Sequence, residues 1–165
     1  MNDENMFDKI HRNAIIIAGA FMGAFLIMAF VFEIVLKDLH LEVQPSIQTT
    51  LQYVLFVVAL LEAISMVIVK NLILSGRIKT KPFPNSQEFT SENEKIGMQR
   101  LFTAFIFAYA IASSIGIYGF LFRLIGKENS LFYAFLGISL ILMAIHFPRK
   151  DDWELRLKNM EIDED

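Results

Sequence analysis

Long apolar runs separated by short polar segments dominate this chain. Four runs stand out, at about residues 13–36, 51–74, 101–125 and 131–147. A bilayer core of ~30 Å needs ~20 helical residues, a length that the first three runs supply and the fourth approaches. The pattern predicts an all-α integral membrane protein, a four-helix bundle that forms a single membrane domain over residues 1–165.

The last segment has a different pattern. Trp153, Leu157 and Met160 are spaced i, i+4, i+7 among polar residues, which predicts a short amphipathic helix at about 151–162. Trp is enriched at headgroup depth, because its ring is apolar and its N–H is polar. We therefore expect Trp153 to anchor this helix at the membrane surface, with docking on a partner protein as the alternative.

The distribution of charge predicts the orientation. Four spans would place both termini and the central loop, residues 75–100, on one side, and that side holds 12 of the 15 Lys and Arg residues. The other three are Lys37, Arg123 and Lys127. Cytoplasmic loops collect Lys and Arg. We therefore expect cytoplasmic N and C termini in a multi-pass protein of the cell membrane, the inner membrane if the source is bacterial.

Composition narrows the possible functions. The chain is 55% hydrophobic with 16 Phe, more apolar surface than a soluble domain of 165 residues can bury. It has no cysteine, which excludes disulfides and thiolate metal sites. Metalloprotease, P-loop, nucleophile-elbow and dinucleotide-binding motifs are absent, as is a basic patch interleaved with aromatic residues. We predict that the protein is not an enzyme, needs no cofactor and binds no nucleic acid.

A metal site is also not predicted. Asp38, His40 and Glu42 alternate in the polar segment after the first run. Two carboxylates and one His on a loop, without a fixed scaffold, rarely suffice to bind a metal ion. A solvated loop is the favoured interpretation.

Small residues mark two faces along which helices are expected to pack. Gly19 and Gly23 form a GxxxG pair in the first run, and such residues let two helix backbones approach closely in lipid. The pair fits either a close contact within the chain, which we favour, or a contact with a second copy. The third run carries a narrower stripe, which consists of Ala108, Ala112, Gly116 and Gly119.

One carboxyl group, that of Glu62, lies near the middle of the second run. A charge at the middle of a bilayer costs several kcal/mol, so such a group normally faces protein or water and often marks a working site. The second and third spans run in opposite directions, so we expect a hydrogen bond to Glu62 from Ser113, Ser114 or Tyr109. Apolar surroundings favour the neutral form of a carboxyl group. We therefore expect Glu62 to hold a proton near neutral pH.

Two functions follow from Glu62. In the first, the chain is a non-enzymatic subunit of a membrane helix assembly in which Glu62 binds a proton or cation. In the second, Glu62 only ties two helices together, and the chain is a structural or accessory subunit. Both imply the lipid bilayer and other membrane subunits, or copies of this chain, as partners. A carrier or channel is a weaker third option, since it needs a polar path.

A second polar pair is expected near the outer interface. Glu33 and Arg123 lie in the last turns of their runs and are placed to form an interface ion pair. Separate hydration of the two groups is the alternative, and an exposed pair would contribute less than about 1 kcal/mol.

The run SSIGIYGFL, Ser113 to Leu121, resembles the second helix of the proteolipid, or c, subunits of rotary ATPases. In that family an acidic residue carries the proton or Na⁺, and a similar Ile-Tyr-Gly sequence follows it. Ser113 stands here in the place of that acid, and the family's glycine-repeat helix is missing. The run EAISMVIV, which begins at Glu62, also looks like the acid-containing segment, although the predicted orientation reverses its direction. The resemblance implies a helix assembly with an ion-binding carboxylate, for which Glu62 is the candidate.

Overall fold

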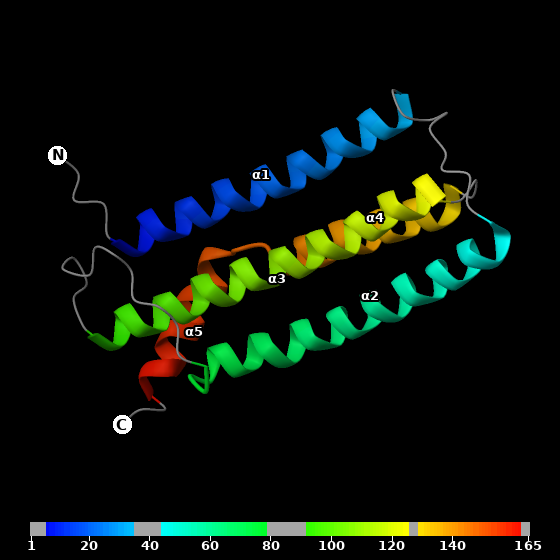
Figure 1. Ribbon diagram of the computed structural model, residues 1–165. Helices are drawn as coiled ribbons and strands as arrows, with labels where there is room; N and C mark the ends of the chain where they lie inside the picture. Colours follow the sequence, from blue (N-terminus) through cyan, green and yellow to red (C-terminus); the bar gives the residue numbers. More distant parts are fainter. Residues whose placement is uncertain (1–5, 35–43, 79–91, 126–128, 163–165) are drawn as a thin grey trace.

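The computed structural model describes residues 6–34, 44–78, 92–125 and 129–162, which contain five helices and no strand (Figure 1). The helices are α1 (Met6–Ile34), α2 (Pro45–Leu74), α3 (Glu92–Ile125), α4 (Asn129–Ile145) and α5 (Lys150–Ile162).

Three of these helices are long and apolar enough to cross a membrane. The qualifying segments are Met6–Ile34, Ser46–Leu74 and Glu94–Ile125, of 29, 29 and 32 residues. α4 and α5 qualify only as one bent segment, Ser130–Ile145 with Lys150–Asn159, with an angle of 59° between the two parts. The prediction of an all-helical chain is therefore confirmed for the described residues. Three helices are candidate membrane spans, and the fourth span stays a prediction.

α3 lies at the centre of the bundle and contacts each of the other four helices. α1 and α2 flank it, and α4 runs beside it (Figure 1). In the most apolar stretch of α3, 56% of the residues are buried inside the protein, against 11% in α1 and in α2. The outer helices therefore expose wide apolar faces, which include Ile27 and Phe30 on α1 and Leu60 and Leu61 on α2. Such faces suit helices that lie in lipid.

Successive helices alternate in direction. α1 begins, α2 ends and α3 begins at the end of the bundle where α5 lies, and α4 begins at the other end (Figure 1). We call the end of the bundle where α5 lies the α5 end, and the end where α4 begins the opposite end. The alternation is the arrangement that the short polar segments between apolar runs predicted.

The predicted small-residue stripe of α3 is buried. Ala108 and Ala112 are each 1% exposed. Ser139 of α4 donates a hydrogen bond from its Oγ to the carbonyl oxygen of Ala112 at 2.7 Å. The side chain at position 112 is small, so the hydroxyl of α4 reaches the backbone of α3. This contact fixes how α4 is placed along α3.

The two glycines of the stripe lie where neighbouring atoms leave no room for a side chain. A Cβ atom at Gly119 would lie 3.1 Å from the carbonyl oxygen of Phe132. A Cβ atom at Gly116 would overlap the ring of Phe25 and lie 2.9 Å from the Oγ of Ser139. The stripe is therefore the close-packing face that the sequence predicted, and it receives α4 and α1 together.

The other small-residue pair is not packed in this way. Among the described residues, a Cβ atom at Gly19 or Gly23 would meet nothing within 4 Å. The favoured interpretation of the pair, a close contact within the chain, is therefore wrong. α1 approaches α3 through a different face, that of Ala14, Ala18 and Phe25, which are buried. A contact of Gly19 and Gly23 with a second copy stays a prediction.

Pro148 bends the chain between α4 and α5. Proline has no N–H, so the carbonyl oxygen of Ala144 loses its usual donor four residues on. The N–H of Phe147 donates to Ala144 instead, at 3.3 Å, and no longer serves Met143. The hydroxyl of Tyr109 donates to the Met143 carbonyl oxygen at 2.9 Å. Tyr109 therefore supplies from α3 the hydrogen bond that the proline removes from α4.

Two contacts connect the start of α1 to this bend. The Nε2 of His11 lies 2.9 Å from the carbonyl oxygen of Pro148 in a buried contact. A carbonyl oxygen only accepts hydrogen bonds, so Nε2 is the donor in this contact. The ammonium group of Lys150 lies 2.7 Å from Asp8. The hydrogen bond from Lys150 and the charge of Asp8 raise the pKa of that ammonium group.

Trp153 does not lie at the outer surface of the protein. Its side chain is 6% exposed, and its ring packs edge-on against His11 at 5.7 Å and Phe105 at 6.3 Å. The prediction that Trp153 anchors α5 at the membrane surface is therefore wrong. The bend at Pro148 turns α5 across the ends of α1 and α3, so the indole enters the protein core. The side chain of Met160 lies outside the described residues.

We predict that Gly116→Ala lowers the free energy of unfolding by about 1–3 kcal/mol, because overpacking a filled core has this cost. Gly137→Ala is the matched control, since a Cβ atom there would meet nothing within 4 Å. Chemical unfolding of the purified protein in detergent, followed by circular dichroism, measures both. Equal stability of the two variants would contradict the close packing of α3.

Candidate functional site

Glu62 lies near the middle of α2, on a face that contacts α3. Its neighbours on that face are buried: Ala59 is 6% exposed and Met66 is 2% exposed. The Oγ of Ser65 donates to the backbone carbonyl oxygen of Glu62 at 2.8 Å. The polar contacts of the carboxyl group itself come from side chains of α3.

Two hydroxyl groups of α3 meet one oxygen of that carboxyl group. The hydroxyl of Tyr118 donates to Oε1 of Glu62 at 2.7 Å, and the Oγ of Ser114 lies 3.2 Å from the same atom. The two hydroxyl oxygens are also 3.2 Å apart. A hydroxyl group has one proton to donate. Tyr118 therefore gives its proton to Glu62, and Ser114 donates either to Glu62 directly or to the oxygen of Tyr118.

The other carboxyl oxygen has a different environment. Oε2 of Glu62 is buried and has no hydrogen-bond partner among the described residues. A buried ionised oxygen without a partner costs several kcal/mol. The two hydroxyl groups of α3 therefore approach Oε1 only, and the hydrogen bonding of the carboxyl group is asymmetric.

Of the predicted partners of Glu62, the structure brings only Ser114 to it. The Oγ of Ser113 donates to the backbone carbonyl oxygen of Tyr109 at 2.8 Å. The hydroxyl of Tyr109 bonds Met143 of α4, as described above. Ser113 therefore bonds within its own helix, Tyr109 connects α3 to α4, and neither side chain donates to the carboxyl group.

Tyr118 is the contact that the sequence analysis missed. It lies four residues after Ser114, so the two side chains share a face of α3 and meet the same point on α2. That spacing is the signal that could have found it. Both donors lie within the run that resembles the proteolipid subunits, residues 113–121.

The second predicted pair has a different partner in the structure. The Oε2 of Glu33 accepts a hydrogen bond from the hydroxyl of Tyr133 of α4 at 2.8 Å. Arg123 is buried at the same end of the bundle, 7% exposed. The observed contact therefore joins α1 to α4, and the ion pair between Glu33 and Arg123 stays a prediction.

Two apolar cavities lie along α2, and the side chain of Glu62 lines neither of them. One cavity, of about 200 Å³, is lined by residues that include Ala59 and Ala63, on either side of Glu62. A second cavity, of about 340 Å³, lies toward the opposite end and shares Phe56 and Phe135 with the first. Three polar side chains line the second cavity, those of Thr49, Gln52 and Tyr53. The cavity nearer the start of α2 is therefore the more polar of the two.

No three His, Cys, Asp or Glu side chains of the described ranges come together in a group able to hold a metal ion. Asp38, His40 and Glu42 lie outside those ranges. Searches against protein families, curated proteins and solved structures give no match for this chain. The functional argument for the Glu62 site therefore rests on the geometry of its side chains.

We predict that Tyr118→Phe lowers the free energy of unfolding by about 1–3 kcal/mol, because it removes the donor closest to a buried carboxyl oxygen. Tyr53→Phe is the matched control, since Tyr53 is 71% exposed on the same pair of helices. Chemical unfolding of both variants in detergent measures the difference. A Tyr118→Phe variant as stable as Tyr53→Phe would show that the hydrogen bond contributes nothing.

Proposed function

We propose that this protein is a non-enzymatic subunit of a membrane helix assembly in which Glu62 binds and releases a proton between α2 and α3. A monovalent cation is the other possible occupant. The single observation that carries the proposal is the asymmetry of the carboxyl group, with two hydroxyl groups within 3.2 Å of Oε1 and a buried Oε2 without a partner among the described residues. The resemblance of residues 113–121 to an ion-carrying helix supports the same chemistry.

The proposed topology has four spans, with the α5 end in the cytoplasm. α4 has 17 residues, which span about 26 Å at ~1.5 Å per residue, close to the thickness of a bilayer core. It runs beside α3, which is long and apolar enough to cross a membrane. The excess of Lys and Arg in the segments at the α5 end supports the cytoplasmic placement.

The proposed partners are other membrane helices. α1 and α2 are the least buried of the three candidate spans, and the face of Gly19 and Gly23 is open to a close helix contact. Such a contact would come from a second copy or from another subunit of the assembly. An intramembrane carboxyl group in such an assembly is placed to couple ion binding to a change in helix packing.

The alternative is a structural or accessory subunit. The hydrogen bond from Tyr118 to Glu62 is an observed connection between α2 and α3, and this connection favours a purely structural role. In that case the carboxyl group keeps one protonation state throughout the physiological range of pH.

Infrared spectroscopy of the protein in lipid nanodiscs distinguishes the proton-binding function from the purely structural role. If Glu62 exchanges a proton, the C=O stretching band of its neutral form decreases as the pH is raised from mildly acid to mildly alkaline, and Glu62→Gln removes that change. For a cation site, added Na⁺ at constant pH also decreases the band. A band that persists or is absent at every pH supports the structural role.

Glu33→Gln is the matched control for this measurement, because Glu33 also accepts a hydrogen bond from a tyrosine but is exposed at a helix end. This variant is expected to keep the pH-dependent band. The unfolding of Glu62→Gln is measured alongside, so that a loss of the band through misfolding is recognised.

A further inference from the structure

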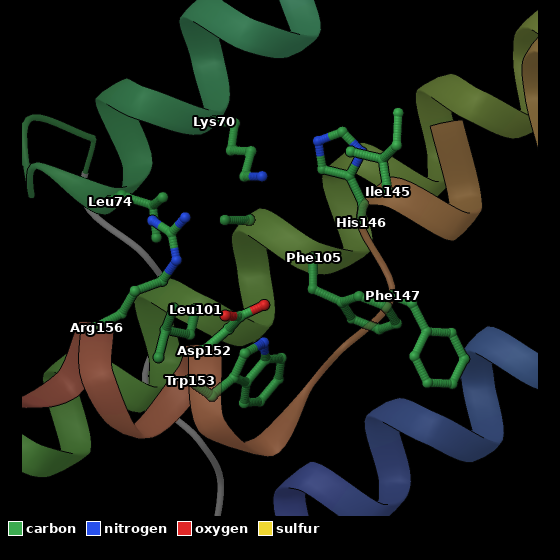
Figure 2. Close-up of a pocket in the computed structure, with 11 residues that line it drawn as sticks. Lys70, Leu74, Leu101, Phe105, Ile145, His146, Phe147, Asp152, Trp153 and Arg156 are labelled. Carbon is green, nitrogen blue, oxygen red and sulfur yellow. The ribbon is translucent and has the colours of Figure 1, made fainter. Parts of the chain in front are cut away.

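A small cavity lies at the α5 end, where α2, α3 and the bend between α4 and α5 meet (Figure 2). Its volume is about 80 Å³, which is room for a few water-sized groups and on the order of one phosphate group. Part of its wall is apolar and tightly packed, formed by Leu101, Phe105 and Trp153, which are between 4% and 6% exposed. Charged side chains line the remaining part of the cavity wall.

Two cations point into this cavity from different helices. Figure 2 shows the ammonium group of Lys70 on α2 and the guanidinium group of Arg156 on α5 directed toward the same space. Asp152 and His146 also line it. Two positive charges and one negative charge give a net charge of +1 while His146 is neutral. That value matches the single negative charge of a phosphodiester.

The described residues around the cavity carry more positive than negative charge. Within the described part of the chain, no ion pair joins Lys70 or Arg156 to a carboxylate. Arg156 is close enough for its charge to act on Lys70, and Lys70 acts in the same way on His146. This repulsion in a partly dehydrated place is relieved when an anion binds between the cations.

The cavity also has an apolar exit. Ile145, the last residue of α4, lines it and is 69% exposed. The exposed face of α2 continues away from Lys70 with Val67 and Ile68, which are 55% and 54% exposed. A ligand held by its phosphate in the cavity therefore has lipid-facing apolar surface beside it. An acyl chain can pack against such a surface, whereas a free phosphate ion cannot.

We propose that this cavity binds the phosphate of a membrane phospholipid with a net negative headgroup, with Lys70 and Arg156 as its ligands. The acyl chains leave past Ile145 and lie against α2 and α4. Basic pockets between membrane helices bind anionic headgroups in this way. The topology proposed above would place this lipid in the cytoplasmic leaflet. The chemistry of headgroup binding does not depend on that topology.

Trp153 provides the reporter for a test, because it is the only tryptophan of the chain and forms part of the cavity wall. The full-length protein in neutral detergent is titrated with phosphatidylglycerol, with phosphatidylcholine and with inorganic phosphate, and the emission of Trp153 is followed. We expect a saturable change with phosphatidylglycerol. Lys70→Gln and Arg156→Gln each weaken its binding about fivefold, and the double variant about thirtyfold, as expected for ~1 kcal/mol per charge.

Two further variants keep the proposal falsifiable. Asp152→Asn removes the negative charge from the cavity and is expected to tighten binding about fivefold, an effect that a merely damaged fold does not produce. Lys158→Gln removes an equal positive charge from α5 outside the cavity and is expected to leave binding unchanged. The unfolding midpoint of each variant without lipid shows that it is folded.

Three results would overturn the proposal. Equal responses to phosphatidylglycerol and phosphatidylcholine would exclude recognition of the net negative charge. Saturation by inorganic phosphate at the same concentration would indicate a site for a soluble anion. An equal loss in Lys158→Gln and Arg156→Gln would show that general surface charge, and not the cavity, attracts the lipid. None of these outcomes bears on Glu62, which lies on another part of α2.

Discussion

Hydrogen bonds from side chains to α3 and from α3 to its neighbours decide how this bundle is arranged. Between apolar helices there is no water, so each buried polar group has to find its partner within the protein. Tyr109 reaches the carbonyl oxygen of Met143 in α4, Ser139 of α4 reaches the backbone of α3, and Tyr118 reaches Glu62 of α2. Each bond is possible at one register and one rotation of the helices only. The apolar contacts favour association, and the polar groups select the arrangement.

At two places in the described protein, polar groups lack the partners that this constraint requires. At Glu62, two hydroxyl groups lie within 3.2 Å of one carboxyl oxygen, and the other oxygen is buried without a partner among the described residues. At the α5 end, Lys70 and Arg156 face one cavity without an ion pair in the described ranges. The proposed occupant of the first is a proton or small cation, and that of the second is an anion. Both involve α2, yet they lie at different depths, one near the middle of the helix and the other near its end.

The candidate site could be predicted in part. Opposite directions of α2 and α3 place residues of similar depth side by side, and this argument correctly brought Ser114 to Glu62. It also suggested Ser113 and Tyr109, because depth says nothing about the rotation of a helix around its axis. Adjacent residues differ by about 100° in direction, so Ser113 points to the backbone of its own helix. The direction of Tyr118 depends on the same rotation.

The sequence by itself determined the class of the protein. A run of about 20 apolar residues has few states other than a spanning helix, because a bilayer leaves backbone groups no external partner. The stripe of Ala108, Ala112, Gly116 and Gly119 on α3 was likewise readable, since small residues are useful where helices touch. Only the tertiary structure decided which helix takes the centre and where α5 goes. Gly19 and Gly23 carry the same signal as the stripe on α3 but face no neighbour in the described chain, and Trp153 is buried because one bend at Pro148 turns α5 inward. Such choices depend on packing between distant segments, and local sequence patterns do not contain that information.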